Sequence, residues 1–422
     1  MNRKLTLGIA LLVLCIVSLG SSSCLYSGHP KWGFIDKTGT LVIPFTFDDV
    51  AEDNYGGFED PNSAQFLPKP FRNFSEGLCA VRIGDKWGYI DKTGKVVIPA
   101  EYDSAGTFSE GLACVRKGLK VGYVDKTGRV VIPIELDWFP NWQLKDPAEA
   151  GFSDAGKSFI QALQFSDGLA AAYKGANSGY IDKTGKFVIE PKWDRCSLFR
   201  EGMGIVSKNF ALSCIDRSGT VTLQLPPKTG LYGDGFFVQG LEPSKLVSTD
   251  KTGKQAIQGL EPAQLVYIDK TGKRAIQQVF TGATAFSEGL AAVETYAASG
   301  PLDPKENKAW GYIDKSGKMV IAPCCYVAGN NLASAFIDGR AIVSQLDFNP
   351  LAMRNLHGVL DRTGKWIVPP KYDHIAAYRD GLALAHKYNT SVFLNKEGVE
   401  VIDTHKPWAN SFSDGMAAVM QP

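Results

Sequence analysis

The sequence is short of the residues on which catalysis and nucleic-acid binding usually depend. Its 45 Lys and Arg balance 44 Asp and Glu, for a net charge of +1, and no stripe of basic residues stands out. We therefore expect no nucleic-acid surface. The five histidines are scattered, and there is no Gly-x-Ser-x-Gly motif, phosphate loop or closely spaced histidine pair. We predict a protein that is not an enzyme and has no catalytic residue or cofactor.

Cysteine spacing also lacks a metal signature, because none of the eight cysteines forms a Cys-x-x-Cys pair. Cys79 and Cys114 fall in strands where other copies of the same phrase have Ala, so we interpret them as small buried residues. The acidic residues in the first interruption of the repeat lack the alternating spacing of a calcium loop. They are Asp48, Asp49, Glu52, Asp53, Glu59 and Asp60. We expect a solvated loop there and no metal.

Sustained helical periodicity is absent as well. The chain of 422 residues contains 44 Gly and 22 Pro, and no window keeps apolar residues at helical spacing. The sequence therefore predicts an all-β protein with many turns.

What the chain has is a repeated phrase, seen in full from Trp87 to Pro99 as Trp-Gly-Tyr-Ile-Asp-Lys-Thr-Gly-Lys-Val-Val-Ile-Pro. Its Asp-x-x-Gly core recurs at Asp36, Asp91, Asp125, Asp182, Asp216, Asp250, Asp269, Asp314, Asp361 and Asn395. A second phrase, Phe-Ser-Glu/Asp-Gly-Leu-Ala-x-Val, alternates with it. Asp91 lies 17 residues before Phe108 and Phe108 lies 17 residues before Asp125, which gives a unit of 34 residues. This regular self-similarity indicates a repeat protein.

Each unit reads as short antiparallel strands joined by tight turns. Gly94 can take positive φ and the Asp91 carboxylate can accept backbone N–H groups in the turn. Phe-Ser-Glu-Gly reads as a second turn, and residues 101–105 could form a fourth strand. Trp87 and Tyr89 would point to one face of the sheet, with Gly88 and Ile90 on the other. Apolar residues on both faces require sheets stacked on both sides, as in the blades of a propeller.

The two ends of the repeat array complement each other. The first repeat, at Trp32, lacks the Phe-Ser-Glu-Gly strand, and the last, at Phe412, lacks the hairpin. Pairing them would close a ring and remove two exposed sheet edges. We predict a closed β-propeller-like ring of about eight or nine blades. An open β-solenoid of hairpins is the alternative.

The Trp-Gly dipeptides at Trp32-Gly33, Trp87-Gly88 and Trp310-Gly311, with the Ile-Asp-Lys-Thr/Ser-Gly that follows them, carry a family resemblance. The chain resembles the WG (KWG) repeat proteins of bacteria from Lys31 to Val419. Several copies depart from the pattern, for example His357-Gly358, which lacks the Trp. The resemblance implies a β-repeat architecture and transfers no catalytic residue.

The chain divides into three predicted parts. Residues 1–23 form a signal peptide with a basic start, an apolar stretch and a small-residue end. Residues 24–30 are a short tether, and residues 31–422 form the repeat domain. We expect insertions in that domain at 45–73, 134–164, 240–258, 294–309 and 344–357. Elaborated loops on one edge of a repeat array usually mark a binding face.

Cys24 follows the small residues directly, which suggests a lipidated, membrane-anchored exported protein in the periplasm or at the cell surface. Ordinary cleavage near Ser23 and secretion is the alternative. In the second insertion, Trp138, Phe139 and Trp142 interrupt the repeat and are ligand-binding candidates. Equally, these three aromatic residues could plug the ring or cover a blade.

These features predict an exported, non-catalytic binding or scaffold protein whose insertions engage a protein or glycan at the cell surface. One alternative is a cell-wall-binding hairpin array, in which Trp and Tyr of neighbouring hairpins form exposed aromatic cages. A less favoured alternative is a propeller hydrolase with inward-facing carboxylates confined to single blades.

Overall fold

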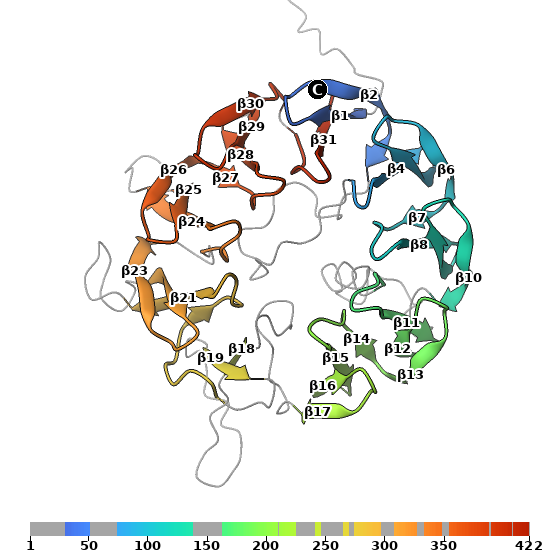
Figure 1. Cartoon of the computed structure of the whole chain (residues 1–422), viewed down its shortest axis with the longest axis horizontal. Coiled ribbons are helices and arrows are strands. Elements are labelled where there is room, and N and C mark those ends of the chain that lie inside the picture. The colour runs from blue at the N-terminus through green and yellow to red at the C-terminus, as the bar shows by residue number, and fades with distance from the viewer. Residues whose placement is uncertain are drawn as a thin grey trace, which may run out of the picture.

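The repeats form sheets arranged around a closed ring in the computed structural model (Figure 1). The structure describes residues 30–50, 74–137, 163–209, 211–224, 241–245, 265–269, 274–296, 308–326, 333–347, 354–387, 390–406 and 408–421. These residues contain β-strands and turns but no helix, as predicted. Within these ranges, no helix has the length and hydropathy needed to cross a membrane.

The first half of the described chain forms four sheets. In chain order, its strands are β1 (Trp32–Asp36), β2 (Leu41–Phe47), β3 (Asp49–Val50), β4 (Leu78–Ile83), β5 (Lys86–Asp91), β6 (Val96–Tyr102), β7 (Ser104–Ala105), β8 (Leu112–Lys117), β9 (Lys120–Asp125), β10 (Val130–Asp137), β11 (Ala170–Lys174), β12 (Asn177–Ile181), β13 (Phe187–Trp193), β14 (Arg195–Cys196), β15 (Met203–Lys208), β16 (Ala211–Asp216) and β17 (Val221–Gln224). The sheets are β2-β1-β31, β3-β4-β5-β6, the seven-stranded β13-β12-β11-β10-β9-β8-β7, and β14-β15-β16-β17.

The second half forms four more sheets and supplies the last strand of the first one. Its strands are β18 (Leu241–Lys245), β19 (Leu265–Asp269), β20 (Gly282–Ala283), β21 (Leu290–Tyr296), β22 (Lys308–Asp314), β23 (Met319–Tyr326), β24 (Arg340–Asp347), β25 (Arg354–Asp361), β26 (Trp366–Tyr372), β27 (His374–Ile375), β28 (Ala383–Lys387), β29 (Thr390–Leu394), β30 (Glu400–Asp403) and β31 (Met416–Met420). The sheets are β18-β19, β20-β21-β22-β23, β24-β25-β26 and β27-β28-β29-β30.

Four of the eight sheets are complete four-stranded blades. The seven-stranded sheet joins two successive units, because Asp137 at the end of β10 pairs with Tyr173 of β11. The fourth strand of each unit is shorter than predicted. In the unit at Ser104–Ala105 it is only β7, and Glu101 and Tyr102 belong to the end of β6.

The ring closes through the two ends of the repeat array. β31 pairs with β1 in an antiparallel register from Trp32↔Met420 to Asp36↔Met416, and the two strands lie side by side in Figure 1. The first and last strands therefore complete one sheet, which confirms the predicted ring and excludes the open solenoid.

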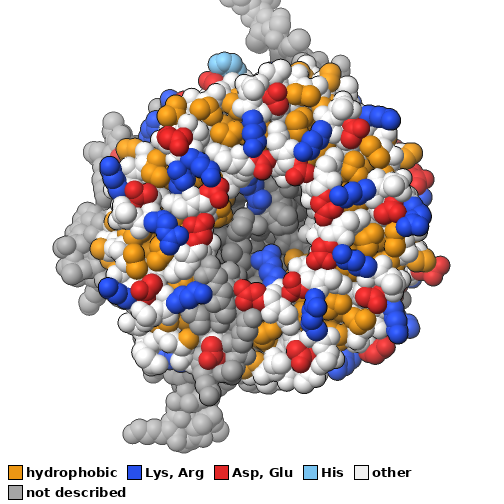
Figure 2. All heavy atoms as spheres, in the orientation of Figure 1, with side chains coloured by type: hydrophobic (Ala, Val, Ile, Leu, Met, Phe, Trp, Pro, Cys, Tyr) orange, Lys and Arg blue, Asp and Glu red, His pale blue; other side chains and the backbone are white. Residues whose placement is uncertain are grey.

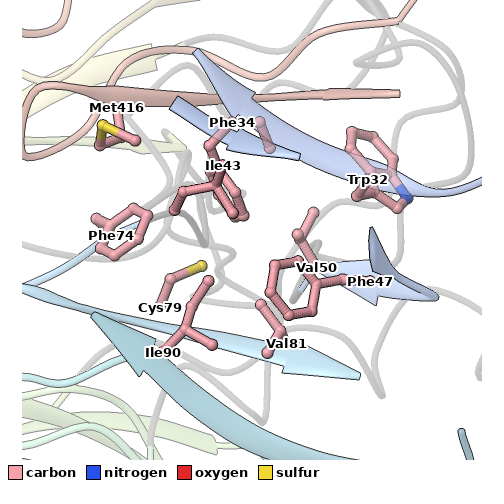
Figure 3. Close-up of a cluster of buried hydrophobic side chains, with 11 residues drawn as sticks. Trp32, Phe34, Ile43, Phe47, Val50, Phe74, Cys79, Val81, Ile90 and Met416 are labelled. Carbon is pink, nitrogen blue, oxygen red and sulfur yellow. The ribbon is translucent and has the colours of Figure 1, made fainter. Parts of the chain in front are cut away.

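Figure 3 shows the apolar core that this closure creates. Phe34 of β1 and Ile43 of β2 face Cys79 and Ile90 of the next blade, with Phe74 between them. The rings of Phe34 and Phe74 meet edge to face, with centroids 5.2 Å apart. Burial of a large apolar side chain stabilises a fold by about 1.5–3 kcal/mol, so the buried side chains of this cluster stabilise the closed ring.

The Asp-Lys-Thr-Gly turns form as expected. Oδ1 of Asp91 accepts hydrogen bonds from Thr93 N at 2.9 Å, Thr93 Oγ1 at 2.6 Å and Lys95 N at 3.1 Å. Gly94 has φ +84°, and a Cβ there would lie 3.0 Å from Cγ2 of Ile43 in the preceding blade. The turn glycine therefore serves both the turn and the contact between blades.

Prolines recur in strands that lie at the outer end of their sheets. Pro44 lies in β2, Pro99 in β6, Pro191 in β13 and Pro323 in β23, each the last strand of its sheet. A proline has no N–H to donate and is tolerated at a sheet edge, where it also discourages pairing with another chain.

The predicted insertion at 240–258 includes a regular strand, β18. Leu241 of β18 lies opposite Asp269 of β19, in the same register as Leu290 opposite Asp314 in the next blade. The strand was hidden in the sequence because the phrase beginning at Gly240 is repeated from Gly259. The described strands also reach into the ends of the other predicted insertions, for example β10 as far as Asp137.

Candidate functional site

Two edges of the ring differ in what they carry. We call the edge with the Asp-Lys-Thr-Gly and Phe-Ser-Glu-Gly turns the turn edge, and the opposite edge the insertion edge. β21 starts at Leu290, opposite Asp314 on the turn edge, and ends at Tyr296, opposite Lys308. The chain between Tyr296 and Lys308 therefore leaves and rejoins the frame at the insertion edge.

Two further interruptions open on the same edge. β24 and β25 pair from Arg340↔Asp361 at the turn edge to Asp347↔Arg354 at the insertion edge. β10 ends at Asp137, opposite Lys120, at the end of the hairpin away from its turn. These three interruptions share one edge, as expected, whereas the first one begins beyond Val50, which lies opposite Val81 within the blade.

On the turn edge, the repeated acidic residue of Phe-Ser-Glu-Gly binds the next blade. The carboxylate of Glu76 accepts the N–H of Gly111 at 3.1 Å and lies 3.0 Å from Nζ of Lys126. The same relation joins Glu110 to Gly168, Asp167 to Gly202, Glu288 to Gly339, Asp380 to Gly415 and Asp414 to Gly77. These carboxylates are structural links between blades rather than features of single turns.

The Phe-Ser-Glu-Gly turns are also tighter than the glycine alone suggests. Glu76 has φ 53° and Gly77 has φ 90°, and Ser75 and Leu78 exchange backbone hydrogen bonds of 2.9 and 3.2 Å. Two successive positive φ values are those of a type I′ turn. The strain on a non-glycine residue, about 1–3 kcal/mol, is offset by the hydrogen bond that the Glu76 carboxylate makes to the next blade.

The insertion edge has its own acidic residues, which tie each outer strand to the following hairpin. Asp137 accepts the N–H of Gly175 at 2.8 Å and a hydrogen bond from Lys120 at 2.5 Å. Burial opposes ionisation of Asp137, but the bonds from Lys120 and Gly175 outweigh it and lower its pKa. Asp48 and Asp103 bind Gly84 and Gly118 in the same way. Asp48 and Asp49 also pair with Lys31 and Arg82, as structural residues.

The sequence candidates Trp138, Phe139 and Trp142 lie outside the described residues, as does Cys24. The structure does describe both ends of the interruption that contains the three aromatics. Asp137 anchors one end, and Leu163 anchors the other, since its carbonyl accepts the hydroxyl of Tyr123 at 2.8 Å. Gln164 Nε2 adds a bond of 2.5 Å to Thr107 Oγ1. The candidate segment thus departs from and returns to fixed points.

The aromatics of the hairpins pack between blades, as the alternation of the strands predicts. Tyr89 is fully buried, its hydroxyl donates to Gly106 O at 2.7 Å, and its ring meets Phe108 at 4.9 Å. Trp87 is half-buried against the same cluster. The hairpin-array hypothesis requires both aromatics to be exposed, and Tyr89 does not meet that requirement.

Cys79 and Cys196 are buried thiols, and burial raises the pKa of Cys196 to about 12. Cys79 has the predicted role of a small core residue, and Cys114 is half-buried against the core of the neighbouring blade. In the part of the chain that the structure describes, no three His, Cys, Asp or Glu side chains are placed to hold a metal ion.

One cluster of side chains was not predicted from the sequence. It contains His357, His374 and His386, which are well separated in the chain. The ring centroid of His374 lies 5.2 Å from that of His357 and 5.9 Å from that of His386. The missing signal was the alignment of the repeats, which places all three beside one blade boundary.

Acidic and basic side chains are interspersed around the ring in Figure 2, in keeping with these pairings. A profile of the family described as WG containing repeat matches residues 32–58, 71–87, 87–120, 122–143, 179–209, 267–295, 310–347 and 358–389, more than half of the chain. The chain belongs to this WG repeat family. A comparison with curated proteins found no significant match.

The WG repeat chain was also compared with solved structures. A crystal structure of the eukaryotic initiation factor has 11% identity and a TM-score of 0.50, covering 94% of this chain and 99% of that chain. Kluyveromyces lactis Hsv2p gives 11% identity and a TM-score of 0.33, covering 68% of this chain and 94% of that chain. An acylaminoacyl peptidase from Pyrococcus horikoshii gives 11% identity and a TM-score of 0.36, covering 82% of this chain and 54% of that chain. At such identities, the first likeness concerns the fold alone.

Proposed function

We propose that this WG repeat protein is a non-catalytic binding or scaffold protein, whose insertions on the insertion edge engage a protein or a glycan. The observation that supports this most is how the repeated polar side chains are used. The carboxylates of Glu76, Glu110 and Asp137 are committed to contacts between blades or hairpins. The interruptions are where the chain departs from that shared frame.

The segment after Asp137 is the favoured binding element. It carries Trp138, Phe139 and Trp142, and aromatic side chains on loops are frequent anchors for sugars and for protein partners. A loop held by a rigid scaffold loses less conformational entropy on binding. Asp137 and Leu163 provide such fixed ends through their bonds to Gly175 and Tyr123.

We also propose that the protein is exported and held at a membrane by a lipid on Cys24. The support is the basic, apolar and small-residue order of residues 1–23. Mass spectrometry of the mature N-terminus tests this directly. A diacylated Cys24 is expected, and a mature chain that begins at another residue without lipid would refute the anchor.

Binding is tested in two arms with the exported form of the chain. An array of immobilised bacterial and host glycans tests the sugar arm, with Trp138→Ala/Trp142→Ala as the variant. Trp408→Ala is the matched control, since Trp408 is an exposed Trp of the frame. Photo-crosslinking from a benzoylphenylalanine at position 139, in the producing cell, tests the protein arm.

Crosslinking from position 119 is the control, because Leu119 is exposed in the turn between β8 and β9 on the insertion edge. Specific binding that the double variant loses and Trp408→Ala keeps supports the proposal. So does a discrete product from position 139 that is absent from position 119. Failure of both arms, or equal binding by the double variant, would remove this segment as the site.

A further inference from the structure

Three of the histidines gather at the boundary between the sheets β24-β25-β26 and β27-β28-β29-β30. His357 lies on β25, His374 on β27 and His386 on β28. His374 and His386 are paired across their strands, and the His357 ring lies next to His374. His357 is buried, whereas the other two are half-buried.

His357 occupies the place that Trp has in other copies of the repeat. His357-Gly358 corresponds to Trp87-Gly88, and both glycines lie under the neighbouring outer strand. A Cβ on Gly358 would lie 2.6 Å from Val368 O, and one on Gly88 would lie 2.5 Å from Ile98 O. An ionisable imidazole therefore replaces an indole at the boundary between blades.

The His357 ring also makes a bond that the apolar part of an indole cannot make. The N–H of Ile375 donates to Nδ1 of His357 at 3.2 Å. This bond joins β25 to β27, the innermost strand of the next blade. β27 contains two residues and pairs with β28 at His374↔His386 and Ile375↔Ala385. The bond to His357 thus adds a contact with β25 to the bonds that hold β27 on β28, such as Asp373 N to His386 O at 3.0 Å and Ala376 N to Leu384 O at 2.8 Å.

Protonation of Nδ1 would break this contact, because a protonated nitrogen cannot accept a hydrogen bond. It would also place a cation in a buried site beside His374. Burial, reinforced by the nearby His374, lowers the pKa of His357 from 6.5 to about 3. Any conformation that exposes His357 binds a proton more readily, so acid favours opening.

No carboxylate bonds directly to the His357 ring to offset that cation among the residues that the structure describes. From β24 and β26, Ser344 and Tyr372 lie opposite His357 in the strand register. The charged groups nearby on the same blades are Lys371, Asp373, Lys387 and Glu400. Glu400 accepts the hydroxyl of Tyr372 at 2.6 Å.

A metal centre does not explain the cluster. The Nδ1 of His357 is already used by Ile375 N, so in this tautomer the other ring nitrogen carries the proton. The described side chains also include no metal-holding group of three.

We propose that His357, His374 and His386 form an acid-sensitive latch, which releases β27 from β25 and loosens the boundary between these two blades when the pH falls. The latch regulates the frame next to the closing sheet and goes beyond the binding role proposed above. One extra proton bound on opening makes the open fraction rise by up to about tenfold per pH unit below 6.5.

Hydrogen exchange followed by mass spectrometry tests the latch on the full chain from pH 4 to pH 8. The quantity measured is the protection of residues 373–387 relative to residues 103–117, which cancels the intrinsic pH dependence of exchange. Residues 103–117 are the matched segment, since Ser104 and Arg116 stand where the latch has His374 and His386. Relative protection of 373–387 should fall steadily below pH 6.5.

His357→Asn is the decisive variant, because Asn offers an acceptor oxygen for Ile375 N and gains no proton in this range. We expect its relative protection to be independent of pH. His357→Trp, which restores the residue of other repeats, provides a second non-titrating variant if the first does not fold. His405→Asn is the control and should behave as the wild type, because His405 is exposed. Constant protection in the wild type, or an acid response retained by the folded His357 variant, would overturn the proposal.

Discussion

The hydroxyl of Ser413 donates a hydrogen bond of 2.6 Å to the carbonyl oxygen of Phe74, across 339 residues of sequence. The same bond joins Ser75 to Phe108 and Ser109 to Phe165 in consecutive blades. The contact between the last repeat and an early one is therefore the ordinary contact between neighbours. The ring therefore closes with the same contact that joins its other neighbouring blades.

The glycine of the Trp-Gly dipeptide should be intolerant of any side chain. A Cβ on Gly88 would lie 2.5 Å from Ile98 O and 2.7 Å from Ala100 N, so β6 must move. We expect Gly88→Ala to lower the free energy of unfolding by about 1–3 kcal/mol, as overpacking does. Gly106→Ala is the control, since its nearest neighbour would be Cys114 O at 3.3 Å. Denaturant unfolding that shows equal losses for the two variants would contradict this explanation.

The turn aspartates should make the fold sensitive to acid. The hydrogen bond from Thr93, helped by the backbone N–H groups of Thr93 and Lys95, lowers the pKa of Asp91 below 3.8. Its contribution is therefore present above pH 3.8 and is lost as the pH falls through the lower folded value.

Asn395 shows how to test that effect, because its Oδ1 accepts from Glu397 N and Val399 N without a charge. We expect Asp91→Asn to retain most of the stability at pH 7 and to reduce the loss as the pH falls below 3.8. Asp91→Ala should be less stable than Asp91→Asn at pH 7. Thermal unfolding across this pH range would refute the account if Asp91→Asn were as acid-sensitive as the wild type.

The link made by Glu76 should depend on its hydrogen bond more than on its charge. Glu76→Gln keeps an acceptor for Gly111 N but loses the attraction to Lys126, and exposed ion pairs contribute about 0–1 kcal/mol. Glu76→Ala loses both, and we expect a cost about 1 kcal/mol greater. Comparison of the free energies of unfolding of the two variants at low and high salt separates the contribution of the hydrogen bond from that of the ion pair. A loss for Glu76→Gln as large as that for Glu76→Ala would show that charge dominates.

The hydroxyl of Tyr89 should contribute separately from its ring. Tyr89→Phe removes the bond to Gly106 O and should cost about 1 kcal/mol. Tyr89→Ala also removes the packing on Phe108 and should cost about 3–5 kcal/mol. Phe34 and Phe393 occupy the same position in other copies and show that the ring alone is tolerated. A Tyr89→Phe variant as unstable as Tyr89→Ala in urea unfolding would contradict this division.

The sequence predicted the frame well because the frame is local and repeated. Asp91 and Gly94 define their turn within four residues, and the alternation of Trp87, Tyr89 and Ile90 assigns the faces of β5. Closure followed from the complementary ends at Trp32 and Phe412. Each of these inferences depends on neighbours along the chain or on the period of the repeat.

Contacts between neighbouring strands and between blades were harder to predict. The role of Glu76 needs Gly111 in the following unit, and the restriction on Gly88 needs the close approach of β6, where the register shifts. The histidine cluster needs three strands from two blades. The residues that interrupt the repeat carry no such period, so the sequence marks Trp138 and Trp142 as candidates without indicating their partner.

The closed frame can be tested most directly by hydrogen exchange at β1. If β31 pairs with β1, the amides of Trp32–Asp36 lie in the middle of a sheet and should be as well protected as those of Lys86–Asp91 in β5. Removal of residues 411–422 should abolish the protection of β1 and leave that of β5 largely intact. Alternate amides of β1 that exchange rapidly in the intact chain, as in an open edge strand, would contradict the ring.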